Sequence, residues 1–245
     1  MALPRVASPT YELTIPSSGE KVSYRPFLVK EEKTLLMAME AGDNRAMAKA
    51  MQDIITSCTE GEVDLKSLAS FDIEYFFLQL RGRSIGEILT INPRRPTNFK
   101  CCEEASEEDI CEVNINIDDI IMDTSKITSS EIQITDDIGI KMKFPQIETV
   151  QKYATEGEDI EASDVFKLII DCIEYIWDGD EIYKAKDSTK KELNDFIESL
   201  SSGQFTKVRD FFESMPRLSH TIDWKCPKCE KSKTLLIEGI DAFFG

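Results

Sequence analysis

The sequence predicts an α+β fold: a helical bundle combined with small antiparallel β-hairpins and a ribbon-like cysteine knuckle that pairs distant segments. Three observations predict it. Apolar residues recur at helical spacing in several stretches, short stretches alternate apolar and polar side chains around turn residues, and Cys226-Pro-Lys-Cys229 stands between two alternating stretches. With 245 residues, of which 41% are hydrophobic, the chain is long enough to bury a core.

The first predicted region, residues 1–90, opens with a β-hairpin. Residues 11–15 and 21–24 alternate apolar and polar side chains on either side of a turn that contains Gly19. Alternation of this kind around a glycine-containing turn is typical of two antiparallel strands. The region is expected to end in a further strand over residues 88–91.

Three helices are expected between this hairpin and that strand. Residues 29–40 carry apolar side chains at helical spacing, and Gly42 stops the pattern. Residues 47–58 show one apolar stripe that includes Cys58, so we expect this thiol in the core. Residues 71–80 are apolar around most of a helical circumference, which indicates a helix packed centrally or against another subunit, with the central position favoured.

The second predicted region, residues 91–145, is expected to be rich in β-structure. Residues 113–117, 132–134 and 138–144 alternate apolar and polar side chains, with acidic turn residues between the last two stretches. We expect them to form one small antiparallel sheet.

The third predicted region, residues 146–217, is expected to be helical. Apolar residues from 165 to 177 indicate one amphipathic helix, and Cys172 at the border of its apolar stripe is expected in the core. Residues 189–192 form a capping-box pattern, which predicts the start of another helix. A further short helix is expected over residues 204–213.

The fourth predicted region, residues 218–245, is expected to form a hairpin that packs on residues 91–145. Its two strands flank the Cys-x-x-Cys motif, so Cys226 and Cys229 should lie at the tip. The four regions are expected to form one integrated domain.

The cysteine spacing predicts a metal site. Seven cysteines, an odd number without a secretion signal, favour reduced thiols or metal ligands over a disulfide framework. A Cys-x-x-Cys at a hairpin tip lets both thiolates reach one metal, but a structural zinc takes four ligands. Four ligands are therefore expected from a candidate set of Cys101, Cys102, Cys111, Cys226 and Cys229, with zinc as the cofactor.

Two alternatives stay open for these thiols. Glu104 stands where the counterpart of Cys229 would fall in the first segment, so the hairpins could pack without metal and leave the thiols free. A redox motif is the weaker alternative, because the motif lies between strands and lacks the βαβ setting of thioredoxin-like proteins.

The sequence favours a protein without enzymatic activity. It contains no P-loop, dinucleotide-binding turn or nucleophile elbow, and its carboxylates show no spacing that marks a catalytic pair. The only histidine, His220, is expected to be an ordinary strand residue. Most hydrolytic mechanisms would therefore lack their usual base.

The charge of the chain bears on its partners. Forty-six acidic residues against 29 basic ones give a formal net charge of -17, which repels the phosphates of nucleic acids and anionic lipids. We expect neither nucleic acid nor a membrane as partner. The first ten residues lack the apolar segment of a signal peptide, and no stretch reaches the roughly 18 apolar residues of a membrane span. A soluble protein made in the cytosol is expected.

Four blocks of sequence occur in a fixed order along the chain. They are Tyr24-Arg-Pro-Phe-Leu-Val-Lys-Glu-Glu-Lys33, Phe71-Asp-Ile-Glu-Tyr-Phe-Phe-Leu-Gln-Leu-Arg81, Ser84-Ile-Gly-Glu87 and Phe211-Phe-Glu-Ser-Met-Pro-Arg-Leu218, and the last precedes the cysteine knuckle. Together they resemble the baseplate hub protein family of T-even-type contractile-tailed phages. The resemblance covers nearly the whole chain. The family carries two Cys-x-x-Cys knuckles, and this chain departs from that pattern at the first.

The resemblance implies a non-enzymatic hub component or hub-assembly factor of the phage tail baseplate. Such a protein acts through contacts with other baseplate hub and tail spike proteins during virion morphogenesis, in the host cytoplasm. Retention in the virion tail and the oligomeric state stay open. The alternative function is a zinc-ribbon module that recruits nucleic acid or transcription machinery, which the negative charge opposes.

Clustered aromatic residues are candidate contact points with such partners. They are Tyr75, Phe76, Phe77, Phe243 and Phe244. Core packing is the favoured interpretation for the first three, and both interpretations stay open for Phe243 and Phe244.

Overall fold

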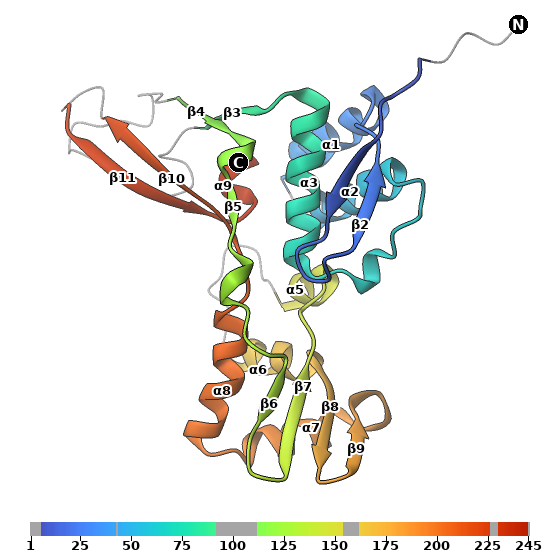
Figure 1. Ribbon diagram of the computed structural model, residues 1–245, viewed down its shortest axis with the longest axis vertical. Helices are drawn as coiled ribbons and strands as arrows, with labels where there is room; N and C mark the ends of the chain where they lie inside the picture. The colour runs from blue at the N-terminus through green and yellow to red at the C-terminus, as the bar shows by residue number, and fades with distance from the viewer. Residues whose placement is uncertain (1–5, 43, 92–111, 154–161, 226–229, 245) are drawn as a thin grey trace, which may run out of the picture.

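The computed structural model describes residues 6–42, 44–91, 112–153, 162–225 and 230–244. The fold is α+β, as predicted. Figure 1 shows an upper body, which contains the first and the last hairpins, and a lower body built on a four-stranded sheet. Among the described residues, the upper body consists of those up to 122 and from 218 onward, and the lower body of those from 131 to 213.

The upper body begins with the predicted hairpin and the three predicted helices. β1 (Tyr11–Thr14) pairs with β2 (Lys21–Tyr24), and α1 (Val29–Ala41), α2 (Asn44–Cys58) and α3 (Ser70–Ile85) follow. α1 ends at Gly42, whose φ of 64° gives the left-handed conformation that favours glycine at a helix end. Side chains from all five elements form one buried cluster that includes Leu13, Leu35, Ile54 and Phe76.

A buried carboxylate fixes the hairpin to the start of α3. Asp72 is fully buried and accepts hydrogen bonds from the Ser17 N–H at 2.9 Å, the Ser17 hydroxyl at 2.5 Å and the Ala69 N–H at 2.9 Å. Burial raises the pKa of Asp72, although the three donors act in the opposite direction. One side chain thus both caps α3 and holds the turn between β1 and β2.

A second buried carboxylate joins the β2–α1 connection to the end of α2. Glu31 accepts hydrogen bonds from the Arg25 guanidinium at 2.9 Å, the Ser57 hydroxyl at 2.6 Å and the Leu28 N–H at 2.9 Å. Arg25 also donates to the Ser57 carbonyl at 3.1 Å, where the end of a helix favours a cation. Burial alone would raise the pKa of Glu31, but these donors lower it to about 2. The Arg-Pro-Phe block therefore orients α1 against α2.

Two further hairpins complete the upper body. β3 (Ile88–Ile91) pairs with β4 (Val113–Asn116), and the predicted last hairpin is confirmed as β10 (Leu218–Lys225) with β11 (Ser232–Glu238). β10 also pairs with β5 (Ile121–Met122). Both hairpins pack with α3 and α9 (Asp241–Phe244) in a separate buried cluster. Three 3-10 turns belong to the connections: η1 (Leu65–Ser67), η2 (Ile117–Asp119) and η3 (Thr124–Lys126).

The lower body is an antiparallel sheet covered by helices. Its strands are, in order across the sheet, β6 (Glu131–Gln133), β7 (Ile138–Met142), β8 (Ile173–Asp178) and β9 (Glu181–Lys184). Ile132, Ile140 and Ile176 lie opposite one another on one face and pack against helices. These helices are α6 (Ala162–Asp171), α7 (Lys190–Glu198) and α8 (Ser202–Glu213). The predicted capping box of α7 is present, since Thr189 N–H donates to the Glu192 carboxylate at 2.7 Å.

Two sequence predictions in these segments are wrong. The helix predicted over residues 165–177 ends at Asp171, and residues 173–178 form β8. β8 is a central strand that gains a hydrogen-bonded neighbour on each side, and this pairing outweighs the helical spacing of its isoleucines. The single middle sheet is also wrong, because residues 113–116 pair with β3 whereas residues 131–142 join β8.

The two bodies are joined at a neck. α5 (Ile147–Tyr153) contacts α2 and α3 of the upper body and α6 of the lower body. The ring of Phe144 stacks on Phe211 at 5.1 Å between centroids and meets Phe71 edge-on at 5.2 Å. Residues on both sides of position 145 therefore share one buried cluster. The limits of the four regions predicted from the sequence stay a prediction.

Candidate functional site

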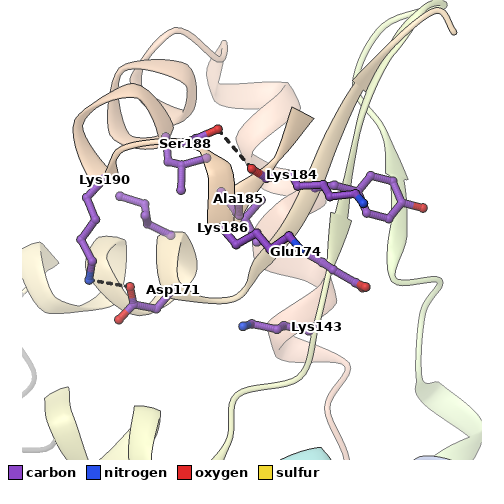
Figure 2. Close-up of a pocket in the computed structure, with 12 residues that line it drawn as sticks. Lys143, Asp171, Glu174, Lys184, Ala185, Lys186, Ser188 and Lys190 are labelled. Carbon is purple, nitrogen blue, oxygen red and sulfur yellow. Dashed lines mark hydrogen bonds and ion pairs between the residues drawn. The ribbon is translucent and has the colours of Figure 1, made fainter. Parts of the chain in front are cut away.

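An open hollow lies on the lower body, where α6 ends, β8 begins and η4 (Ala185–Asp187) leads into α7. It encloses about 570 Å³. Figure 2 shows Lys143, Lys184 and Lys186 along one side of the hollow and Lys190 with Asp171 on the other. The hollow combines residues from four elements and the connections between them.

The wall of the hollow is apolar beneath a charged rim. Ile170, Ile173 and Leu193 line it and are themselves buried, with 7%, 2% and 6% of their surface exposed. Tyr175 adds a half-buried aromatic ring. An apolar wall with a charged rim is the usual arrangement of a protein contact surface.

Asp171 is the most strongly held charge at the hollow. Its carboxylate accepts from Lys152 at 2.7 Å, from the Tyr153 hydroxyl at 2.6 Å and from Lys190 at 2.9 Å. Burial alone would raise the pKa of Asp171, but these donors lower it to about 2. This carboxylate therefore fixes α5, α6 and α7 to one another and stays ionised at neutral pH.

Three of the rim lysines remain available. Within the part of the chain that the structure describes, Lys143, Lys184 and Lys186 form no ion pair with a carboxylate. All three are exposed. The rim as a whole carries four lysines against Asp171 and Glu174, so its local charge is opposite in sign to that of the chain.

A second hollow adjoins the first at the neck. It encloses about 400 Å³ and shares Lys143 and Glu174 with the first. Lys66 from the upper body and Lys141 from β7 also line it. Lys141 pairs with Glu131 at 3.3 Å. The two hollows together present a band of lysines that runs from the neck along the lower body.

The sequence interpretation missed this band. One signal was present, since residues 184–191 contain four lysines within a chain of net charge -17. Lys143 comes from a different segment, and nothing in the sequence connects it with Lys184, Lys186 and Lys190.

The five predicted zinc ligands lie outside the described residues. In the sequence, they fall between strands that pair with each other. The pair Ile91 with Val113 closes β3–β4 just before the stretch that carries Cys101, Cys102 and Cys111. The pair Lys225 with Ser232 does the same for Cys226 and Cys229. Among the described side chains, no three His, Cys, Asp or Glu residues are grouped as a metal ion would require.

The predicted contact aromatics lie mostly inside the protein. Phe76 and Phe77 are 0% and 1% exposed in the main core cluster, so the core alternative describes them. Tyr75 is half-buried and packs against both upper clusters. Phe243 is 3% exposed within the hairpin cluster, because α9 folds back against β3 and β11, and the Phe244 side chain lies outside the described part.

Three further residues considered in the sequence are Cys58, Cys172 and His220. Cys58 and Cys172 are buried, as predicted, and burial raises their thiol pKa values to about 11 and about 12. His220 lies in β10 as expected, with Nδ1 3.0 Å from the Asp119 carbonyl oxygen. No helix in the described ranges is long and apolar enough to cross a membrane.

The fold and the site define an acidic α+β protein of two bodies with an open, lysine-lined surface hollow. The chain belongs to the T4 bacteriophage base plate protein family, whose model matches residues 8–245. It is similar to the baseplate hub assembly protein gp26 of Enterobacteria phage T4, with 23% identity over 235 residues. This match covers 96% of the chain and 97% of that protein. No solved structure matches the chain.

Proposed function

We propose that this protein helps to build the central hub of a phage tail baseplate and does so through protein contacts, without catalysis. The observation that supports it is the full-length match to a baseplate hub assembly protein, which leaves no large part of either chain unaccounted for. The family match over residues 8–245 agrees with it. The partners are other hub and tail spike proteins, and the place of action is the host cytoplasm during virion assembly.

The structure suits a role of this kind. Each body has its own buried cluster, and the neck joins them through stacked rings and through α5. A component that positions other proteins needs rigid bodies with surfaces of different chemistry.

A deletion in the phage tests this role. Infection with a phage that lacks the gene should yield incomplete baseplates and no plaques, and a plasmid copy of the wild-type gene should restore both. Normal plating of the deletion phage would contradict the proposal. Mass spectrometry of purified virions against infected-cell lysate then separates a component that stays in the tail from a factor that leaves it.

We further propose that zinc ties the two cysteine-bearing connections together through Cys226, Cys229 and two of Cys101, Cys102 and Cys111. The support is topological, since each connection joins the strands of a hairpin and both hairpins share one buried cluster. In Figure 1 both hairpins extend toward the same side of the upper body. Four thiolates are a usual ligand set for structural zinc.

Metal analysis tests the zinc site. Purified protein should contain close to one zinc per chain, and Cys226→Ser should lose it. Cys58→Ala is the matched control, because Cys58 is buried in the main core and should not affect the metal content. Less than about 0.2 zinc per chain in wild-type protein would contradict a structural tetrathiolate site.

A further inference from the structure

The lysine band stands out against the rest of the molecule. The chain has 46 acidic and 29 basic residues, yet six lysines line the two adjoining hollows: Lys66, Lys141, Lys143, Lys184, Lys186 and Lys190. A positively charged hollow on a negatively charged molecule attracts negatively charged partners. The band therefore favours an acidic partner, and the surrounding surface limits how much of that partner can approach.

Only part of the band is already neutralised. Lys190 pairs with Asp171 at 2.9 Å and Lys141 with Glu131 at 3.3 Å. Lys143, Lys184 and Lys186 have no such ion pair in the described part of the chain. They line the first hollow together, above an apolar wall of buried isoleucine and leucine side chains.

We infer that the first hollow binds a short acidic segment of another baseplate protein. Carboxylates of the segment pair with Lys143, Lys184 and Lys186, and an apolar side chain of the segment contacts the wall formed by Ile173 and Leu193. This inference rests on the proposed function, because it names the chemistry of one partner in hub assembly.

The charge distribution favours a peptide over nucleic acid. A nucleic acid carries phosphates along its whole length, and the net charge of -17 of the chain repels them. A short carboxylate-bearing segment places its charges only where the lysines are.

A binding titration tests the inference with the full-length protein. The probe is a fluorescein-labelled, glutamate-rich peptide with central leucines, followed by anisotropy at low salt. The test variant is the triple substitution Lys143→Gln, Lys184→Gln and Lys186→Gln. The matched control, Lys33→Gln, Lys49→Gln and Lys126→Gln, removes the same charge from exposed lysines elsewhere. Thermal unfolding of both variants confirms that they fold.

The triple variant should bind the peptide about tenfold more weakly than wild type, and the control variant should match wild type. Wild-type binding should also weaken as salt is raised, because the attraction is between charges at a surface. Equal losses in both variants would show unspecific charge attraction and overturn the inference. It would also be overturned by failure of wild type to bind, by equal affinity for a single-stranded oligonucleotide, or by self-association that blocks the hollow.

The phage assay separates this inference from the proposed function. If the deletion phage plates normally, the proposed function fails whatever the peptide does. If the deletion blocks assembly but a plasmid with the triple variant restores it fully, the hub role stands and the hollow has no part in it.

Discussion

Thr128 and Ser214 lie 86 positions apart in the sequence and meet at the neck. The Thr128 N–H donates to the Ser214 hydroxyl at 3.2 Å, and the two hydroxyl oxygens are 2.9 Å apart. All residues of the lower cluster lie between them. The lower body is therefore one continuous insertion whose two chain ends meet at the neck, where α5 also contacts the upper body, and compact domains tolerate insertions of this kind well.

This geometry predicts that residues 128–214 fold on their own. The segment contains the whole lower cluster, and hydrogen bonds hold its two ends together. The isolated segment should show cooperative thermal unfolding by circular dichroism. A fragment of equal length, residues 60–146, divides every cluster and serves as the control, which should not unfold cooperatively. A non-cooperative melt of the first fragment would contradict the prediction.

The Glu31 cluster predicts a pH-dependent contribution to stability. The folded-state pKa of Glu31 is about 2, below the ordinary value near 4.5, so its contribution is present above about pH 5 and is lost as the pH falls toward 2. Glu31→Gln should lower the free energy of unfolding by about 2 to 3 kcal/mol at pH 7. The difference from wild type should shrink as the pH falls.

Glu12→Gln is the matched control for this measurement. Its partner Lys21 lies 3.9 Å away and both side chains are mostly exposed, so the change should stay below about 0.5 kcal/mol. Urea denaturation from pH 7 down to pH 3 provides the comparison. A constant difference between Glu31→Gln and wild type over that range would show that the charge of Glu31 is not responsible.

Gly139 on β7 predicts a steric effect. A Cβ at this position would overlap the ring of Trp177 on the neighbouring strand, which lies directly against the glycine backbone. Gly139→Ala should therefore destabilise the protein by about 2 kcal/mol through displacement of the ring. Gly203→Ala in α8 meets open space and should stabilise the protein by about 0.5 to 1 kcal/mol. Thermal unfolding followed by circular dichroism would show opposite shifts for the two variants, and parallel shifts would refute this account.

The two buried thiols predict how the cysteines react. Cys58 and Cys172 should resist a thiol reagent in the native protein at pH 8, because burial keeps them protonated. Zinc would protect four of the other five cysteines, so one thiol should react at first and more after a chelator is added. Rapid reaction of five thiols before chelation would argue against the metal. Reaction of all seven would argue against the burial.

The sequence predicts elements best where local signals agree. In α7, capping residues and apolar spacing both mark the same start at Thr189, and the structure confirms it. In residues 173–178 the two kinds of signal conflict. Ile173, Ile176 and Trp177 fit helical spacing, but β7 and β9 supply partners on both sides, and only the tertiary fold reveals them.

The lysine-lined hollow could not be predicted from the sequence for a similar reason. Lys143 follows β7, whereas Lys184 and Lys186 flank the end of β9, and the sheet order brings them to one hollow. The aromatic blocks were visible in the sequence, but spacing alone cannot separate a core helix from an exposed one. The burial of Phe76 and Phe77 decides this, since both pack in one cluster with side chains from α2 and from the hairpin β1–β2.

The arrangement of the buried clusters also sets an order for folding during synthesis. The lower body is one continuous stretch, so its contacts can form soon after residue 213 has left the ribosome. The hairpin cluster joins Leu78 to Ile222, Ile237 and Phe243, and this part of the upper body stays incomplete until those last partners emerge. A truncated translation product would carry a finished lower body on an unfinished upper one.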